Sequence, residues 1–468
     1  MRYHFLPILS TAAMVLALSS ACSNNHDTPC DGVLSYPTLL TEAELLAQPH
    51  LLAGIYAAYP GPIAQELTPT PDGYEPFYIS HYGRHGSRFQ PNDSRYVDTR
   101  QRLRDAQDKG NLTPYGQSLL SRIERLCDYA CGHGGMLTTI GARQHREIAQ
   151  RMYERFPVVF ARGQHVSARS SVVPRCVESM QAFVGALTAC DSTIHVVSES
   201  DSCYMRYLSY ETPEMRALAK DKDTWYQEYG QYALNHLELG RLMDTLFVNP
   251  AGLDSLMTYA DLYWLVAGMQ NLDLDVDLSD VFTPTEMLRA YRCVNYRMYV
   301  TCGNSPTGRG VPAASASSLL CHIIESADLA LSCDTISADL RFGHDSNLLR
   351  LLTLMQVHNA ANAEADTARY WAAWQECLLS PMAANLQLVF YRPAGSCDAV
   401  AGSLSAHSHN PSDSILVKFL LNENETLLDA PVSPFSGPYY WWPDVREFLS
   451  SRLHVAEADD STFTVNIQ

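Results

Sequence analysis

Two arginines that flank one histidine are the residues of this chain best suited to chemistry. Residues 82–88 read YGRHGSR, so Arg84 and Arg88 stand on either side of His85, and the glycines let a ligand approach the backbone. A guanidinium keeps its charge at any cellular pH, and its planar fork matches two oxygens of a phosphate group. A neutral imidazole between such groups has a free lone pair with which it can attack phosphorus. We interpret residues 82–88 as the centre of a covalent phosphoryl-transfer site.

Hydrolysis of a phosphate monoester also needs further positive charge and an acid for the leaving alcohol. Arg175 can hold phosphate oxygens, His344 can donate a further hydrogen bond, and Asp345 can protonate the leaving oxygen. Arg169 either contacts the phosphate or pairs with an acidic side chain. Since the arginines supply the charge that a metal ion supplies elsewhere, we expect no metal and no cofactor. The acid must be protonated while the imidazole of His85 is not, which predicts a mildly acidic pH optimum.

Three short strands must carry these groups to one place. Residues 77–81, 165–168 and 336–342 have the apolar or alternating pattern of buried strands, and a polar cluster follows each of them. Helices are predicted to begin at Pro174 and directly after residue 345. In an open α/β sheet, ligands bind where the carboxyl ends of strands meet helix starts. We therefore expect one pocket to gather all three clusters.

The remaining pattern predicts an α/β fold, with a central, mostly parallel sheet flanked by helices. Residues 386–391 and 415–421 are two further predicted strands. From 204 to 331 long helical patterns dominate and strand signals are sparse, which indicates a helical cap inserted into the sheet domain. The predicted core therefore consists of residues 36–203 and 332–468.

Helix-start signals support this reading. Thr41 and Glu44 have the spacing of a capping box, and Thr113 precedes Pro114 at the start of a second predicted helix. A third helix is predicted over 139–156.

Composition excludes some classes of protein. The chain has 468 residues, of which 46% are hydrophobic and 18% charged, which is typical of a globular protein. The formal net charge of −18 argues against a nucleic-acid partner, because such proteins carry a basic excess. We expect a monomer that acts on a small phosphorylated substrate.

The N-terminus, residues 1–22, has the pattern of an export signal. Arg2 provides a positive charge, and residues 5–18 form an apolar run too short for a stable membrane span. Residues 18–22 read LSSAC and resemble a bacterial lipoprotein cleavage box with Cys22 as the lipidated residue. Ordinary cleavage near Ala21 is the alternative. The expected location is the cell envelope, as an outer-membrane lipoprotein that faces the periplasm or the exterior and touches the membrane only through its lipid.

Cysteine content points the same way. Of thirteen cysteines, twelve remain besides Cys22, and an even number in an exported chain favours disulfides. Cys190 and Cys203 flank a predicted strand, and we expect them to form one bridge. The sequence contains no Cys-x-x-Cys pair with matching histidines, so it does not indicate a zinc site.

The two motifs together resemble a known family. Residues 82–88 and the GHDSNL sequence at 343–348 are similar to the two signatures of the histidine acid phosphatases, the histidine phosphatase branch that includes phytases. Within it the chain most resembles the multiple inositol-polyphosphate phosphatases. Supporting matches are residues 135–138, Gly141, His145, 175–183 and 420–423.

The resemblance implies a phosphoglycerate-mutase-like α/β core with a helical cap, and hydrolysis through a phosphohistidine. The residues that it places in the phosphate site are Arg84, His85, Arg88, Arg175, His344 and Asp345. One departure concerns the second motif, which usually reads His-Ala-Glu in inositol-polyphosphate phosphatases. Here Asp345 follows His344 directly and Ser346 takes the next place, as in phytases and general acid phosphatases. The substrate and the phosphate removed first stay open.

Three functions are therefore compared. The first is a phosphomonoesterase for inositol polyphosphates, phytate included, and the second is a broad-specificity acid phosphatase. The predicted cap contains an acidic run, whose members are Asp273, Asp275, Asp277 and Asp280. This run slightly favours the broad-specificity phosphatase, unless it lies away from the pocket as a solvated segment. The third, a non-catalytic surface lipoprotein that binds phosphorylated ligands, has no need of the Arg/His/Asp set.

Overall fold

The computed structural model describes residues 38–453 except 64–65, 162–163, 222, 224, 334 and 396–413. The predicted export signal and Cys22 lie outside the described residues. Among the helices that are described, none combines the length and the hydropathy that a membrane-spanning segment needs.

One eight-stranded sheet, in the order β3-β2-β4-β1-β5-β6-β7 with β8 beside β6, forms the centre of the fold. The strands are β1 (Tyr74–Arg84), β2 (His165–Ser170), β3 (His195–Ser200), β4 (Ile336–Gly343), β5 (Asn385–Pro393), β6 (Leu416–Leu421), β7 (Asn424–Thr426) and β8 (Tyr439–Trp441). The first four strands of this order are parallel, β5 is antiparallel to β1, and β6 is antiparallel to β5. Five strands thus point the same way, so the predicted mostly parallel α/β sheet is confirmed, with an antiparallel edge.

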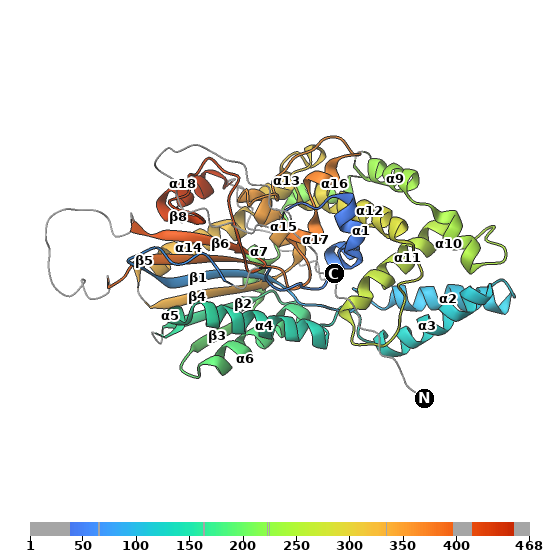
Figure 1. Cartoon of the computed structure of the whole chain (residues 1–468), viewed down its shortest axis with the longest axis horizontal. Helices are drawn as coiled ribbons and strands as arrows, with labels where there is room; N and C mark the ends of the chain where they lie inside the picture. Colours follow the sequence, from blue (N-terminus) through green and yellow to red (C-terminus); the bar gives the residue numbers. More distant parts are fainter. Residues whose placement is uncertain are drawn as a thin grey trace, which may run out of the picture. The chain divides into compact units, whose positions relative to one another are not determined.

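Helices cover both faces of the sheet, as buried parallel strands require. Figure 1 shows α4 (Thr139–Arg155), α5 (Pro157–Phe160) and α6 (Pro174–Cys190) below the strands, where α5 and α6 contact β4. Above them lie α14 (Ser317–Ser332), α15 (Asp345–Leu354) and α18 (Trp442–Ser451), of which α14 and α15 contact β1. The predicted helix start at Pro174 is confirmed, and α15 begins at Asp345, one residue before its predicted start.

A second group of helices lies beyond one end of the sheet. It contains α8 (Pro213–Lys220), α9 (Trp225–His236), α10 (Leu239–Leu246), α11 (Ser255–Gly268), α12 (Pro284–Cys302) and α13 (Val311–Ala314). The short helix α7 (Met205–Leu208) precedes them in the chain and contacts β4 and α14. Figure 1 shows α2 (Ser94–Asp108) and α3 (Pro114–Ala130) beside this group, where they contact α11 and α10. The domain boundaries at 203 and 331 stay a prediction, although α14 packs against the sheet and α2 and α3 pack with the cap helices.

Short helical pieces complete the chain. These are α1 (Glu42–Ala47), α16 (Tyr370–Ala373), α17 (Glu376–Leu379) and the 3-10 turns η1 (Pro49–Tyr56), η2 (Ser202–Tyr204), η3 (Met269–Asn271) and η4 (Pro306–Gly308). The predicted capping box at α1 is confirmed, since Thr41 and Glu44 each accept a hydrogen bond from the other's backbone N–H. The predicted helix after Thr113 is also confirmed, because the Thr113 side chain caps α3.

The expected bridge between Cys190 and Cys203 is wrong. Every described cysteine is a free thiol. Cys190 ends α6, before β3 begins, whereas Cys203 lies in η2, after β3 has ended. A six-residue strand spans about 20 Å, while the Cα atoms of a disulfide lie within about 7 Å. Two cysteines that flank a strand are thus held apart by it.

Two histidines are buried behind the end of β1. The rings of His81 and His145 both pack on Phe342. Burial lowers the pKa of His81 to about 3, helped by the nearby His145 and Arg341. Burial also lowers the pKa of His145 to about 4. Both imidazoles are neutral in the folded protein at every pH above these values.

These histidines predict a loss of stability in acid. In the unfolded chain they bind protons near pH 6.5, so their contribution to stability is complete above that pH. As the pH falls from 6.5 toward 4 and 3, each costs about 1.4 kcal/mol per pH unit. We expect His81→Leu to reduce the difference between the free energies of unfolding at pH 7 and pH 4.5, measured with urea. His50→Leu, at an exposed position, is the control, and an equal pH dependence in His81→Leu and wild type would contradict the prediction.

Candidate active site

Parallel pairing brings the two predicted motifs to the same edge of the sheet. Arg84 ends β1 and Gly343 ends β4, and these residues are register partners in the ladder. His85 and His344 therefore follow neighbouring strand ends, and their ring centroids are 5.8 Å apart. β2 is the other neighbour of β4, and α6 begins soon after it, which brings Arg175 to this edge.

The loop after His85 is held by close contact with the start of α4. A Cβ atom on Gly86 would lie 2.6 Å from the Cα of Gly141, and one on Gly141 would lie 2.2 Å from the carbonyl oxygen of Ser87. Only glycine fits at either position. Thr138 caps α4 by accepting from the Gly141 N–H, and its hydroxyl donates to the Ser87 carbonyl at 3.0 Å. Helix α4 thus sets the path of the loop.

A backbone contact fixes the tautomer of His85. Its Nδ1 lies 2.9 Å from the carbonyl oxygen of Gly86. Because a carbonyl only accepts, Nδ1 carries the proton and Nε2 keeps its lone pair. Burial lowers the pKa of His85 well below its ordinary value, and the charges of Arg175, Arg84 and Arg88 lower it further. The imidazole therefore stays neutral in mild acid.

Arg84 is fully buried, and one of its nitrogens is saturated by backbone oxygens. Nη1 donates to the carbonyls of Ile55 and Ser380, each at 2.7 Å. Nη2 lies 2.9 Å from Oδ2 of Asp345, while Nε has no hydrogen-bond partner among the described residues. Burial lowers the pKa of Arg84 to about 10, against the opposing effect of Asp345, so the group keeps its charge at neutral pH. Nε and Nη2 are the nitrogens of Arg84 that no backbone oxygen occupies, and Nη2 is the one that faces Asp345.

Arg88 is anchored in the same way by different partners. Its Nη1 donates to the hydroxyl of Tyr56 at 2.9 Å and to the carbonyl of Phe89 at 2.8 Å. Within the described part of the chain, Nε of Arg88 has no hydrogen-bond partner. The two arginines therefore both direct an Nε–Nη2 edge away from their anchors, and bidentate phosphate binding uses such an edge.

Arg175 and His344 also line the site. Burial lowers the pKa of Arg175. Burial also lowers the pKa of His344 to about 4, with Arg175 acting in the same direction and Asp345 opposing it. Nε2 of His344 lies 3.4 Å from the hydroxyl oxygen of Ser171. His344 is thus a neutral hydrogen-bonding group beside the arginines.

Asp345 lies at the first turn of α15 with 20% of its side chain exposed. Its Oδ1 accepts from the Ser346 N–H at 2.7 Å, and its Oδ2 faces Arg84. Burial raises the pKa of Asp345, but the charges of Arg84 and Arg88 and the hydrogen bond from the Ser346 N–H help to hold it below its ordinary value. The carboxyl group is therefore ionised in the free protein near neutral pH.

These groups line one cavity of about 270 Å³. The predicted residues among its lining are His85, Arg88, Arg175, His344 and Asp345. Arg84 reaches the same place through its contact with Asp345. The structure thus brings together six of the predicted site residues. Their roles in catalysis stay a prediction.

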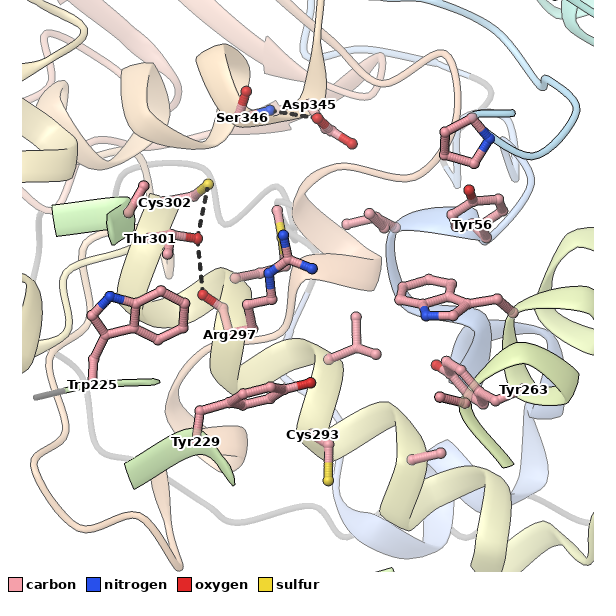
Figure 2. A pocket seen from close by; sticks show the side chains of 18 of the residues that line it. Tyr56, Trp225, Tyr229, Tyr263, Cys293, Arg297, Thr301, Cys302, Asp345 and Ser346 are labelled. Carbon is pink, nitrogen blue, oxygen red and sulfur yellow. Dashed lines mark hydrogen bonds between the residues drawn. The ribbon is translucent and has the colours of Figure 1, made fainter. Parts of the chain in front are cut away.

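A larger cavity of about 640 Å³ continues from the first beneath the helices of segment 204–331. The two cavities share lining residues, among them Arg88, Asp345 and Ser346. In Figure 2 the side chain of Arg297, from α12, reaches into the middle of this space. Its guanidinium makes no ion pair with the described residues. The further cationic residues of the lining are Arg95, Arg216, Lys220 and Arg350, and the aromatic ones are Tyr56, Trp225, Tyr229, Tyr259, Tyr263 and Trp264.

Arg169 is not brought to either cavity. Its Nε lies 3.5 Å from Glu199 on the neighbouring strand β3, and its guanidinium lies 5.2 Å from the ring centre of Tyr204. The structure therefore supports the second interpretation of Arg169, in which it pairs with an acidic side chain.

Several residues of the site were not singled out from the sequence. Tyr56 stands 32 residues before Arg88, and no local pattern connects them. Ile55 and Ser380 contribute only backbone carbonyls, which carry no signal of residue type. Arg350 on α15 could have been noticed, because it lies within two helical turns of Asp345.

Comparisons with known proteins agree with this geometry. The family model described as "Histidine phosphatase superfamily (branch 2)" matches residues 83–422. No curated protein matches the chain. Among solved structures, the Bifidobacterium longum multiple inositol polyphosphate phosphatase in complex with phosphate has 18% identity and a TM-score of 0.70, covering 87% of this chain and 99% of its own. Its complex with inositol hexasulfate has 17% identity, a TM-score of 0.68 and coverages of 86% and 99%. A phytase from D. castellii has 16% identity, a TM-score of 0.60 and coverages of 86% and 85%. At these identities the likeness shows the fold, and the predicted fold class is confirmed.

Proposed function

Because the chain belongs to the histidine phosphatase superfamily (branch 2), we propose that it hydrolyses phosphate monoesters through a phosphohistidine at His85, with inositol polyphosphates, phytate included, as substrates. One observation carries the proposal: the Nδ1–H of His85 is tied to the Gly86 carbonyl, so Nε2 carries a lone pair beside three arginines.

In the first step the Nε2 lone pair of His85 attacks phosphorus and the bond from phosphorus to the alcohol oxygen breaks. The bonding pair goes to that oxygen, which takes a proton from Asp345. Arg84, Arg88 and Arg175 stabilise the charge on the three non-bridging oxygens, and positioned cations of this kind lower a barrier strongly in a water-poor site. The imidazolium of the adduct is then neutralised in the second step.

In the second step water attacks the phosphohistidine. The carboxylate of Asp345 takes a proton from the water, the bond from phosphorus to Nε2 breaks, and its electron pair returns to the His85 ring. Inorganic phosphate leaves, and Asp345 is protonated again for the next substrate. Apart from water, no step needs a group other than those of the chain and the substrate.

The larger cavity favours a substrate with more than one phosphate. Arg297 reaches into this space without an anionic partner among the described residues, and an anion placed there would gain from it. The B. longum neighbour, whose fold this chain shares, was solved with inositol hexasulfate, a polyanionic cyclitol. The acidic run in segment 204–331 does not argue against this, because it lies against α3: Asp280 pairs with Arg122, and neither lines the cavities.

Comparing two substrates tests the proposal against a broad-specificity acid phosphatase. We expect wild type to release phosphate from both phytate and p-nitrophenyl phosphate. Arg297→Ala should raise the KM for phytate about tenfold, because the substrate loses one contact with a charged group. The same substitution should change the KM and kcat for p-nitrophenyl phosphate much less. Arg143→Ala is the matched control, since Arg143 is exposed on α4 and outside both cavities. Cleavage of the aryl ester with negligible release from phytate would favour the broad acid phosphatase.

Export, lipidation of Cys22 and a monomeric state are part of the same proposal. Export and lipidation rest on the sequence of residues 1–22. An envelope location would give the enzyme access to phosphate esters outside the cytoplasm.

A further inference from the structure

Tyr56 makes two contacts with Arg88, one through its hydroxyl and one through its ring, and a third contact with Gln90. Its hydroxyl accepts the hydrogen bond from Nη1 of Arg88 at 2.9 Å and donates to Oε1 of Gln90 at 3.2 Å. The Arg88 guanidinium also lies 4.8 Å from the centre of the Tyr56 ring. The ring is buried, with 2% of its surface exposed, and it packs on Trp264 at 5.2 Å. Tyr56 thus touches Arg88 with both its hydroxyl and its face.

The direction of each hydrogen bond follows from Gln90. The amide nitrogen Nε2 of Gln90 donates to the carbonyl oxygen of Trp264 at 2.7 Å, and a carbonyl can only accept. Oε1 must therefore face the other way, toward Tyr56 and toward Arg95, which donates to it at 2.8 Å. The Tyr56 hydroxyl donates its hydrogen to this oxygen, so the lone pair of the Tyr56 hydroxyl is free to accept from Arg88.

This arrangement decides which edge of Arg88 faces the substrate. Nη1 has two hydrogens, one of which goes to Tyr56 and one to the carbonyl of Phe89. A guanidinium is planar and rigid, so fixing both hydrogens of Nη1 fixes the rotation of the whole group. The Nε–Nη2 edge is then the one left for two oxygens of a phosphoryl group.

We propose that Tyr56 is a positioning residue that sets the orientation of Arg88 for phosphate. Gln90 orients the Tyr56 hydroxyl and is itself bonded to the backbone of α11. The inference rests on the proposed role of Arg88 in phosphate binding. It connects the phosphate site to helix α11 in the cap segment through two side chains, Tyr56 and Gln90.

Tyr56→Phe is the direct test, because phenylalanine keeps the ring and removes only the hydroxyl. We expect kcat/KM to fall about tenfold or more, the cost of a hydrogen bond to a charged group. Because the misdirected contact is to phosphate itself, KM should rise for phytate and p-nitrophenyl phosphate alike. A merely structural effect would lower the amount of active enzyme, and so kcat, without a rise in KM. Tyr299→Phe is the control: Tyr299 is equally buried, its hydroxyl bonds to the backbone of Glu364, and it lines neither cavity.

A double-mutant cycle makes the test specific to Arg88. In an Arg88→Ala background, Tyr56→Phe should cause no further loss of kcat/KM. In a chain with Arg88 intact, Gln90→Leu should reproduce part of the Tyr56→Phe effect. Binding of inorganic phosphate, measured by calorimetry, should weaken about tenfold in Tyr56→Phe as well. Unchanged KM and phosphate affinity in Tyr56→Phe, or equal losses with and without Arg88, would overturn the inference. If wild type binds phosphate but does not cleave esters, the proposed function fails while the phosphate-binding arm still decides the role of Tyr56.

Discussion

Replacing His85 by alanine is expected to abolish turnover and the covalent intermediate together. The variant keeps the arginines but has no lone pair at the position of Nε2, so no phosphorus–nitrogen bond can form. Loss of a catalytic nucleophile lowers kcat by about 10⁴-fold or more. We would measure release of p-nitrophenol and, in base-quenched samples, protein-bound phosphate that is lost on treatment with acid, as expected of a phosphohistidine.

A matched control separates chemistry from folding. His133 is exposed, stacks on Phe89 and lines neither cavity, so His133→Ala should keep both the rate and the adduct. The non-catalytic alternative predicts a different result: a binding lipoprotein would show no turnover even in wild type, and His85→Ala would retain its ligand. Full activity in His85→Ala would exclude the phosphohistidine route.

Asp345→Asn is expected to impair turnover in a way that depends on the leaving group. Asparagine cannot supply a proton, and a positioned acid contributes about 10²- to 10⁴-fold. An alcohol oxygen of phytate needs that proton, whereas p-nitrophenolate is stable enough to leave without it. The rate with phytate should therefore fall much further than the rate with p-nitrophenyl phosphate, and the ratio of the two is the measurement.

The pH dependence follows from the same group. The arginines hold the pKa of Asp345 below its ordinary value, so the protonated acid becomes more abundant as the pH falls. Since His85 stays neutral in mild acid, turnover of phytate by wild type should increase from neutral toward mildly acidic pH. In Asp345→Asn that increase should be absent. Equal losses for both substrates, or an alkaline optimum in wild type, would contradict the role of Asp345 as the acid.

Much of the site could be predicted from the sequence because its signals are local. Arg84, His85 and Arg88 lie within five residues of one another, and His344 is adjacent to Asp345. The strands before them show as short apolar runs, and a parallel sheet aligns strand ends without any need to know the side-chain contacts. The types of these residues therefore indicate the chemistry, and the hydrophobic period of the strands indicates that the residues lie at one edge of the sheet.

The wrong prediction of the Cys190–Cys203 bridge and the open choice for Arg169 were both decided by distances through space, which the sequence does not give. The Cys190–Cys203 bridge fails because β3 separates the two thiols by its own length. Arg169 has the residue type of a phosphate ligand, yet its place on β2 next to β3 pairs it with Glu199. Neither outcome depends on a local pattern.

What the amino-acid sequence determined by itself is the set of groups for which we propose chemistry: a histidine between arginines at the end of a buried strand, and an aspartate at the start of a helix. What only the tertiary structure decided is how these groups are aimed. The carbonyls of Ile55 and Ser380 saturate Nη1 of Arg84, across 29 and 296 residues of chain. Contacts of that kind depend on backbone atoms and on packing between distant segments, and backbone atoms are the same in every residue, so no reading of side-chain types can reveal them.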